Sequence, residues 1–332
     1  MFMKFSSLTF TTTLMAGTMI ALTSNSWLTA WAGLEINLMS MIPLLLKSPS
    51  KSATEGAIKY FLPQAMASVI LITSFMAIYF TSKPLMMEAL PHLILLSLMM
   101  KLGAAPLHYW FPQVLSKTPW GQTLLLLTWQ KIAPFTLMMY FNMNTLTTFF
   151  IIASSVTGAL GGLNQTNLKL ILTYSSIAHT GWMLPLSAVS SKMWLNYFIL
   201  YFMNSVLLVS ILKSFKITNM KQLGTSSMGT PQLMFTVAPI LSLGGLPPMM
   251  GFYAKLTALI FLLKSKMGPM LLIMLSSSLV SLFYYLKMTY SLLMMKSLRM
   301  NMNPVKLSIK ENYLFTVLTF GILMTPALST LI

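Results

Sequence analysis

Long runs of apolar residues recur along the chain, and short stretches rich in Lys, Pro, Gly and Asn separate them. Most runs are close to the ~20 residues that an α-helix needs to cross a bilayer. Because polar residues and Gly or Pro mark the ends of the runs, the pattern predicts an all-α polytopic membrane protein with about eleven transmembrane helices. The predicted spans are 5–23, 26–46, 58–81, 89–116, 121–141, 146–163, 168–189, 192–213, 231–264, 268–295 and 313–331.

Two of these spans are too long for one straight crossing. The span 89–116 contains Gly103 and Pro106, and the span 231–264 contains Gly244–Pro248. Proline removes a helix hydrogen bond and glycine loosens the ladder. We therefore expect two discontinuous helices.

The two interrupted segments resemble each other. Leu102–Phe111 reads LGAAPLHYWF and Leu243–Phe252 reads LGGLPPMMGF, with Leu, Gly, Pro and Phe at equal spacing. Because an odd number of helices separates the copies, the pattern predicts inverted five-helix repeats. The first covers 1–145, the second covers 146–296, and 297–332 adds a loop and a C-terminal transmembrane helix. The alternative is two unrelated proline kinks.

Composition agrees with a membrane setting. With 56% hydrophobic residues, 8% charged residues and a mean hydropathy of +0.76, the chain cannot present a water-facing surface around one core. The net charge of +17 comes from lysines, mostly in short loops, where they meet phospholipids, so the charge does not indicate nucleic-acid binding. The absence of cysteine excludes disulfides, iron–sulfur ligation and a catalytic thiol in this chain.

The basic residues are divided unequally between the two predicted sides. Four lie on one side, namely Lys83, Lys192, Lys264 and Lys266. Thirteen lie on the other side with the N-terminus, namely Lys4, Lys47, Lys51, Lys59, Lys117, Lys169, Lys213, Lys216, Lys221, Lys296, Arg299, Lys306 and Lys310. The positive-inside rule then places the N-terminus inside and, with an odd helix count, the C-terminus opposite.

Four ionisable side chains lie deep within apolar spans: Glu35, Lys101, Lys131 and Lys255. A charge at bilayer depth costs roughly 3 kcal/mol even on a lenient scale, so four of them suggest an ion or proton path. Lysine suits such a path because burial makes it release its proton more readily, whereas arginine stays charged.

Other polar residues are weaker candidates. His179 in the middle of a span could relay protons, or be a neutral histidine bonded to Ser or Thr. His108, in the first interruption, could be a relay or a polar filler of the unwound segment. Lys287 near a helix end can extend its ammonium to the interface. The chain has no dinucleotide loop and no cysteine or histidine cluster for haem or metal, so we expect no redox centre or cofactor within it.

Five segments together carry a family resemblance. They are Trp31–Asn37 (WAGLEIN), Lys101–Pro112 (KLGAAPLHYWFP), Trp129–Pro134 (WQKIAP), Ser175–Trp182 (SSIAHTGW) and Gly244–Pro248 (GGLPP). In this order they resemble the family of mitochondrial NADH–ubiquinone oxidoreductase chain 2, an antiporter-like membrane-arm subunit of respiratory complex I. The resemblance spans nearly the whole chain, and eleven helices is similar to the shortened animal form that lacks three N-terminal helices of the bacterial relatives.

The resemblance implies a proton-translocating subunit of NADH:ubiquinone reductase in the mitochondrial inner membrane. It implies an obligate hetero-oligomer with other membrane-arm subunits, in which NADH, FMN, iron–sulfur clusters and ubiquinone are bound elsewhere. The N-terminus would face the matrix and the C-terminus the intermembrane space.

Residue by residue, the resemblance makes Glu35 and Lys101 a charge pair at the entrance of the coupling axis. Lys131 matches the central lysine, and Lys255 matches the lysine of the second broken helix in the exit half. His179 is a further relay candidate. Two alternatives remain: a cation/proton antiporter subunit of a multisubunit exchanger, and a structural membrane subunit whose buried charges only anchor neighbouring chains.

Overall fold

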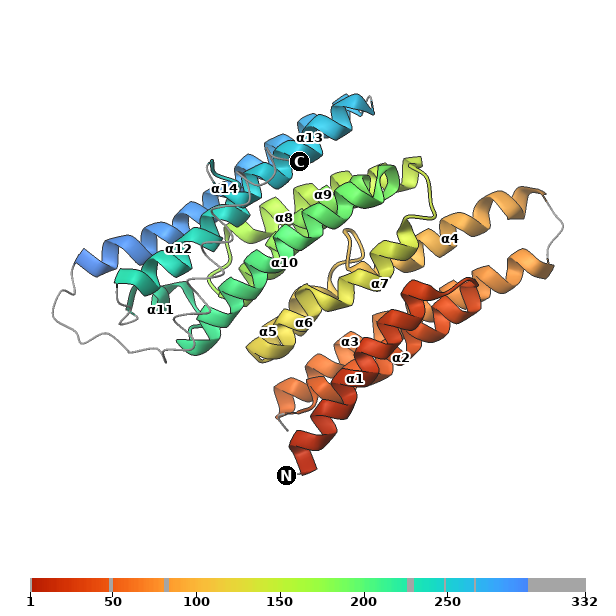
Figure 1. Cartoon of the computed structure of the whole chain (residues 1–332), viewed down its shortest axis with the longest axis horizontal. Coiled ribbons are helices and arrows are strands. Elements are labelled where there is room, and N and C mark those ends of the chain that lie inside the picture. Colours follow the sequence, from red (N-terminus) through yellow and green to blue (C-terminus); the bar gives the residue numbers. More distant parts are fainter. Residues whose placement is uncertain are drawn as a thin grey trace. The chain divides into compact units, whose positions relative to one another are not determined.

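The computed structural model describes residues 2–47, 50–80, 84–225, 230–247, 249–265 and 267–297. These residues form fourteen α-helices (Figure 1). Their bounds are α1 Phe2–Thr23, α2 Trp27–Leu45, α3 Lys51–Phe80, α4 Pro84–Leu102, α5 Trp110–Lys117, α6 Trp120–Leu127, α7 Trp129–Met138, α8 Thr145–Leu163, α9 Leu168–Val189, α10 Ser191–Ser214, α11 Met220–Thr225, α12 Thr230–Gly244, α13 Met250–Lys264 and α14 Gly268–Ser297.

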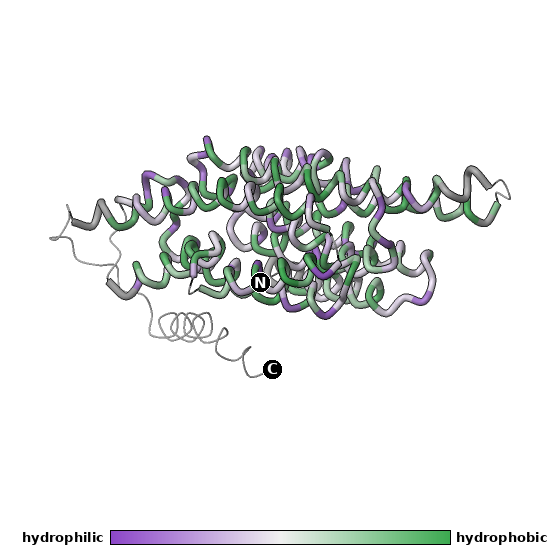
Figure 2. The backbone as a smooth tube through the Cα atoms, turned by 90° about the horizontal axis from the view of Figure 1, so that it is seen from above, coloured by the Kyte–Doolittle hydropathy of each residue, from purple (hydrophilic) through white to green (hydrophobic). Residues whose placement is uncertain are grey.

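The predicted apolar spans coincide with these helices. Every predicted span between residues 5 and 295 overlaps one or two of them, and the last predicted span, 313–331, lies outside the described residues. Within the described chain, five helices are long and apolar enough to cross a membrane, and shorter apolar helices accompany them. Hydrophobic positions run along the helices in Figure 2. The all-α membrane class is therefore confirmed.

Both predicted interruptions are present. α4 ends at Leu102 and α5 begins at Trp110, and α12 ends at Gly244 before α13 begins at Met250. Each break opens with a glycine in the left-handed region, Gly103 at φ 68° and Gly245 at φ 82°. Residues with a Cβ rarely adopt this conformation, so glycine lets the chain leave the helix there.

A third interruption was not predicted. The span 121–141 divides into α6 and α7 at Thr128, whose φ and ψ are −118° and −73°. The Thr128 hydroxyl donates to the Leu124 carbonyl at 2.6 Å. A side chain that hydrogen-bonds the carbonyl four residues earlier competes with the backbone ladder and bends a helix. Lys131 lies in the first turn after this break.

The chain divides into two compact units. Unit 1 comprises the described residues up to Ala153 together with Ser187–Val189, and unit 2 comprises Ser154–Leu186 and the described residues from Ser190 onward. The boundary falls within α8 (Figure 1).

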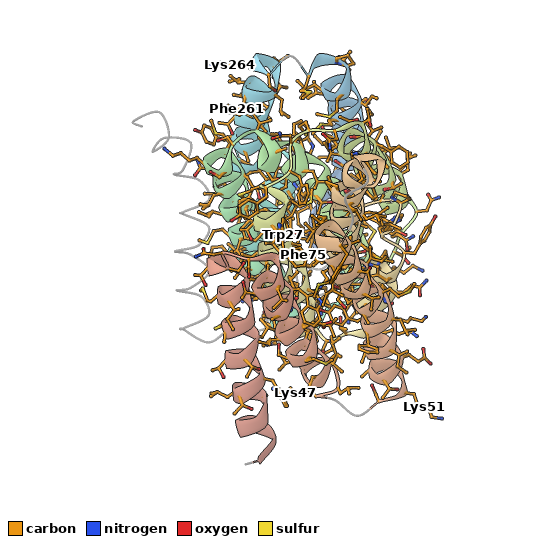
Figure 3. All side chains as sticks on the ribbon, turned by 90° about the vertical axis from the view of Figure 1, so that its right-hand side faces the viewer. Trp27, Lys47, Lys51, Phe75, Phe261 and Lys264 are labelled. Atoms are coloured by element: carbon orange, nitrogen blue, oxygen red, sulfur yellow. The ribbon has the colours of Figure 1, made fainter. Side chains whose placement is uncertain are left out.

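Within unit 1, α1 packs on α2, α2 on α3, α3 on α4 and α5, and α7 on α1 and α4. The contact between α1 and α2 is close because both helices present glycine. A Cβ at Gly17 would lie 3.0 Å from the Gly33 carbonyl oxygen, and one at Gly33 would lie 2.7 Å from the Ala21 nitrogen. Lys47 and Lys51 lie near the same end of this unit, with Trp27 farther along α2 (Figure 3).

Within unit 2, α10 packs on α12 and α13, and α14 packs on α11, α12 and α13. The two parts of the broken helix overlap at Gly251. A Cβ there would lie 1.5 Å from the Ser242 carbonyl oxygen, so only glycine fits. This contact brings the start of α13 beside the end of α12 and thereby sets the geometry of the second break.

Candidate functional site

Unit 1 encloses a small polar cavity beside the first break. Its volume is about 20 Å³, which is room for about one water molecule. Its polar lining residues come from α2, α3, α4 and α7. They are Asn37, Tyr60, Gln64, Lys101, Gln130 and Lys131. The structure therefore brings two of the predicted lysines to one cavity.

Lys101 lies in the last turn of α4 and is 7% exposed. Neutral side chains satisfy the backbone carbonyls around it. Gln64 Nε2 donates to the Lys101 carbonyl at 3.3 Å, and Trp110 Nε1 donates to the Met100 carbonyl at 3.2 Å. Carbonyls at a helix end lack partners within the helix; the Met100 carbonyl also accepts from the Gly103 backbone N–H at 3.2 Å. The Lys101 side chain itself lines the cavity.

Lys131 is 2% exposed and lines the same cavity. Its Nζ lies 5.7 Å from the centre of the Phe111 ring, within the range of a cation–π interaction. Phe111 belongs to α5, so the segment after the first break contributes a wall that stabilises this lysine's positive charge.

Glu35 lies on α2 and is partly exposed. Its carboxylate interacts electrostatically with Lys101. However, the two groups form no ion pair within 4.0 Å, and Glu35 does not line the cavity. The charge pair of Glu35 with Lys101 therefore stays a prediction. A direct ion pair that the sequence did not predict joins Glu55 on α3, which is exposed, to Lys117 on α5, which is partly exposed and far away in the chain.

A hydrogen-bonded pair of amides, one buried and one partly buried, was also not predicted. Gln130 Nε2 donates to Asn37 Oδ1 at 2.9 Å, which joins α7 to α2 at the cavity wall. Their positions in the sequence could have indicated them. Each amide lies in an apolar span close to a predicted charge, Gln130 next to Lys131 and Asn37 close to Glu35. Amides can orient a water molecule between the lysines but do not carry protons themselves.

Unit 2 has its own polar cavity, of about 10 Å³, which is at the lower limit for one water molecule. His179 of α9, Lys255 of α13 and Tyr285 of α14 line it together with three serines, Ser277, Ser278 and Ser281. The structure therefore brings His179 and Lys255 together. These serines carry no distinctive signal in the sequence, because hydroxyls are common in membrane helices and cost little there.

Lys255 is bound to the second break itself. Its Nζ donates to the Gly244 carbonyl at 2.9 Å. Gly244 is the last residue of α12, so the ammonium lies at the negative end of that helix. The lysine chain also fills the space at Gly245, where a Cβ would lie 3.0 Å from Lys255 Nζ.

His179 is 7% exposed, and its Nδ1 lies 2.9 Å from the Tyr197 hydroxyl of α10. The other two candidates lie elsewhere. His108 lies in the first break and stacks on Tyr109 with ring centres 4.6 Å apart, and Lys287 is exposed on α14. Neither lines the two cavities.

The described residues hold no group of three or more His, Cys, Asp or Glu side chains arranged for a metal ion. Both cavities instead combine a lysine, neutral polar groups and space for water. Such a combination can hold a proton on an amine and pass it to water.

The amino-acid sequence matches a known family of membrane proteins. The family described as NADH:quinone oxidoreductase/Mrp antiporter, TM matches residues 24–283, which is most of the chain. The matched range contains Glu35, Lys101, Lys131, His179 and Lys255. The fold is that of the antiporter-like membrane proteins.

Individual relatives narrow the assignment. The chain is 41% identical over 327 residues to the NADH-ubiquinone oxidoreductase chain 2 of Aedes aegypti, covering 96% of this chain and 94% of the relative. It is 39% identical over 317 residues to that of Locusta migratoria, covering 94% and 91%. The chain therefore belongs to the NADH-ubiquinone oxidoreductase chain 2 family.

Solved structures show the same fold. A chain of respiratory complex I from Thermus thermophilus with bound aureothin superposes with a TM-score of 0.85 at 23% identity, covering 96% of this chain and 77% of that chain. A chain of the Mrp complex from Dietzia sp. DQ12-45-1b gives a TM-score of 0.69 at 19% identity, covering 83% and 58%.

Proposed function

We propose that this protein is a proton-translocating, antiporter-like subunit of respiratory complex I, the NADH:ubiquinone oxidoreductase. The proposal rests on family membership together with one structural observation. In each of the two units, a lysine at a helix break lines a cavity that has room for about one water molecule. Redox chemistry with NADH, FMN, iron–sulfur clusters and ubiquinone takes place in other subunits.

The proposed relay uses Glu35, Lys101 and Lys131 in unit 1 and His179 and Lys255 in unit 2. Two unit charges ~8 Å apart at an effective dielectric constant near 20 interact by about 2 kcal/mol. That energy changes the proton affinity of a neighbouring amine more than tenfold. Loss of a proton by one lysine therefore favours protonation of the next. The shared cavity of Lys101 and Lys131 supports this coupling in unit 1.

We further propose that the chain contains eleven transmembrane helices in inverted five-helix repeats, 1–145 and 146–296, followed by a C-terminal segment. Two observations support the repeat. Each half contains a break that opens with a positive-φ glycine, Gly103 or Gly245, and the chain divides into two compact units. Broken helices of this kind provide ion sites in transporters built from inverted repeats.

The proposed setting is the mitochondrial inner membrane, which the chain crosses several times, with the N-terminus in the matrix and the C-terminus in the intermembrane space. Lys47 and Lys51, near one end of unit 1 (Figure 3), fit a basic matrix face. Exposed apolar side chains such as Leu62 (56%) and Leu279 (70%) fit contacts with phospholipids and other membrane-arm subunits.

The test is Lys131→Met in the assembled complex, reconstituted into vesicles. We expect NADH:ubiquinone turnover and the accompanying acidification to fall by about tenfold or more, because a proton-carrying group has been removed. Lys221→Met on α11 is the control, since Lys221 is exposed and lies outside both cavities. Normal proton pumping by Lys131→Met would refute the relay. Sodium-driven proton exchange without NADH would indicate the exchanger subunit instead.

A further inference from the structure

Tyr197 is a buried tyrosine in direct contact with a relay candidate. It lies in the second turn of α10, is 3% exposed, and its hydroxyl lies 2.9 Å from His179 Nδ1. His179 in turn lines the cavity that contains Lys255. Tyr197 does not line that cavity, so any part it plays in proton transfer must act through His179.

The contact restricts the chemistry of the histidine. A neutral imidazole has one N–H donor and one acceptor nitrogen, and the hydrogen bond made by one nitrogen decides which nitrogen carries the proton. If Nδ1–H donates to the Tyr197 oxygen, Nε2 keeps the lone pair. Nε2 can then accept a proton, and the resulting imidazolium makes the same bond through Nδ1–H.

The surroundings of the ring favour this arrangement. The other titratable groups near His179 are Tyr201 on α10, with ring centres 5.2 Å apart, Lys255 on α13 and Tyr285 on α14. No carboxylate lines the cavity. A neutral oxygen such as that of Tyr197 can then stabilise a charged imidazolium by accepting a hydrogen bond from it.

We propose that Tyr197 is a positioning residue of the proton relay: its oxygen accepts from Nδ1–H of His179 and leaves Nε2 as the nitrogen that exchanges protons with the cavity. In one cycle Nε2 gains a proton from the cavity and returns it there, while the Nδ1–H bond to Tyr197 is unchanged. This inference rests on the proposed function and names a further residue of the same relay.

The experiment compares Tyr197→Phe, His179→Ala and the double variant in the assembled complex. We expect Tyr197→Phe to lower coupled NADH:ubiquinone turnover by about fivefold and to increase its solvent deuterium isotope effect. NADH oxidation by a water-soluble acceptor should be unchanged. Tyr290→Phe, an exposed tyrosine of α14, is the matched control. The double variant should be no slower than His179→Ala, because Tyr197 acts only through His179.

Turnover and isotope effect at wild-type values in Tyr197→Phe would overturn the proposal, and so would a full additional loss in the double variant. If His179→Ala pumps normally, His179 is not a relay group and the inference fails, while Lys131→Met still tests the proposed function by itself. If the Tyr197→Phe complex does not assemble, a density map of the unmodified complex tests the hydrogen bond instead. A distance of more than about 3.5 Å between His179 Nδ1 and the Tyr197 hydroxyl would contradict the bond.

Discussion

The two helix breaks of this protein are similar in sequence, but different groups satisfy their backbones. At the first break, the carbonyls at the end of α4 accept from the neutral side chains of Gln64 and Trp110. At the second break, the last carbonyl of α12 accepts from the ammonium of Lys255. The lysine of the first break faces a cavity, whereas the lysine of the second also holds its own break together.

This difference separates two roles that a lysine can have in a relay. Lys101 can gain or lose a proton without changing the bonds that end α4. When Lys255 loses its proton, the charge-assisted bond to Gly244 and the attraction to the helix end both weaken. The protonation of Lys255 and the geometry of the second break are therefore linked, while those of Lys101 and the first break are not.

The largest expected effect is at Lys255. Lys255→Met should reduce coupled turnover by more than about tenfold and speed hydrogen exchange of the backbone amides of Gly245, Leu246 and Met249, because transfer and capping are both lost. Lys255→Arg keeps a positive donor and should restore slow exchange, yet it should still impair turnover, since guanidinium does not release its proton. Full coupled turnover in an assembled Lys255→Arg complex would eliminate the relay role.

At the first break, replacing the lysine by methionine should affect turnover but not hydrogen exchange. Lys101→Met should reduce coupled turnover by about tenfold, with hydrogen exchange at 103–109 unchanged, because Gln64 and Trp110 still satisfy the carbonyls. Mass-spectrometric exchange on the assembled complex measures both breaks in one experiment. Faster exchange at 103–109 in this variant would show that the two breaks are alike after all.

Gln64→Leu should have the opposite effect to Lys101→Met: it should change the stability of the first break and leave turnover nearly unchanged. The Lys101 carbonyl then loses a buried donor, which costs about 1–3 kcal/mol, so thermal stability should fall and exchange at 103–109 should rise. Coupled turnover at low temperature should stay within about twofold, because no proton-carrying group is lost. Gln113→Leu, an exposed site on α5, is the control. A turnover loss as large as that of Lys101→Met would assign Gln64 to the relay itself.

A modest effect on pumping, with almost none on stability, is expected at Glu35. Its carboxylate acts on Lys101 without ion-pair contact, so Glu35→Gln should lower proton pumping by only about two- to threefold and leave assembly nearly unchanged. Pumping rates in vesicles at two salt concentrations measure this. A collapse of assembly would mean that the carboxylate makes a structural contact in the complex.

Much of the fold could be predicted because apolar length and helix breakers are local properties. The spans around Glu35, Lys101, Lys131 and Lys255 all appear as helices, and the two Gly/Pro breaks lie where the sequence places them. The break at Thr128 has neither glycine nor proline at its position, and what accompanies it is a threonine hydroxyl that donates to the Leu124 carbonyl. Threonine is too common in helices for that signal to be recognised in advance.

Partners across the fold could not be predicted. Gln64 and the Lys101 carbonyl, Asn37 and Gln130, and the ion pair of Glu55 with Lys117 all join residues far apart in the chain. Sequence shows that Glu35 needs compensation, but the distance to Lys101 depends on how α2 and α4 pack. One acidic side chain among many lysines has several possible partners, and only packing selects among them.

The close glycine contact between α1 and α2 affects the order in which the helices assemble in the membrane. Neighbouring helices that fit through Gly17 and Gly33 can associate in lipid by van der Waals packing alone, without a charged partner from later in the chain. We therefore expect this hairpin to form as a unit as soon as α2 leaves the insertion machinery. It would then give the later helices, including the one that carries Lys101, a finished surface on which to assemble.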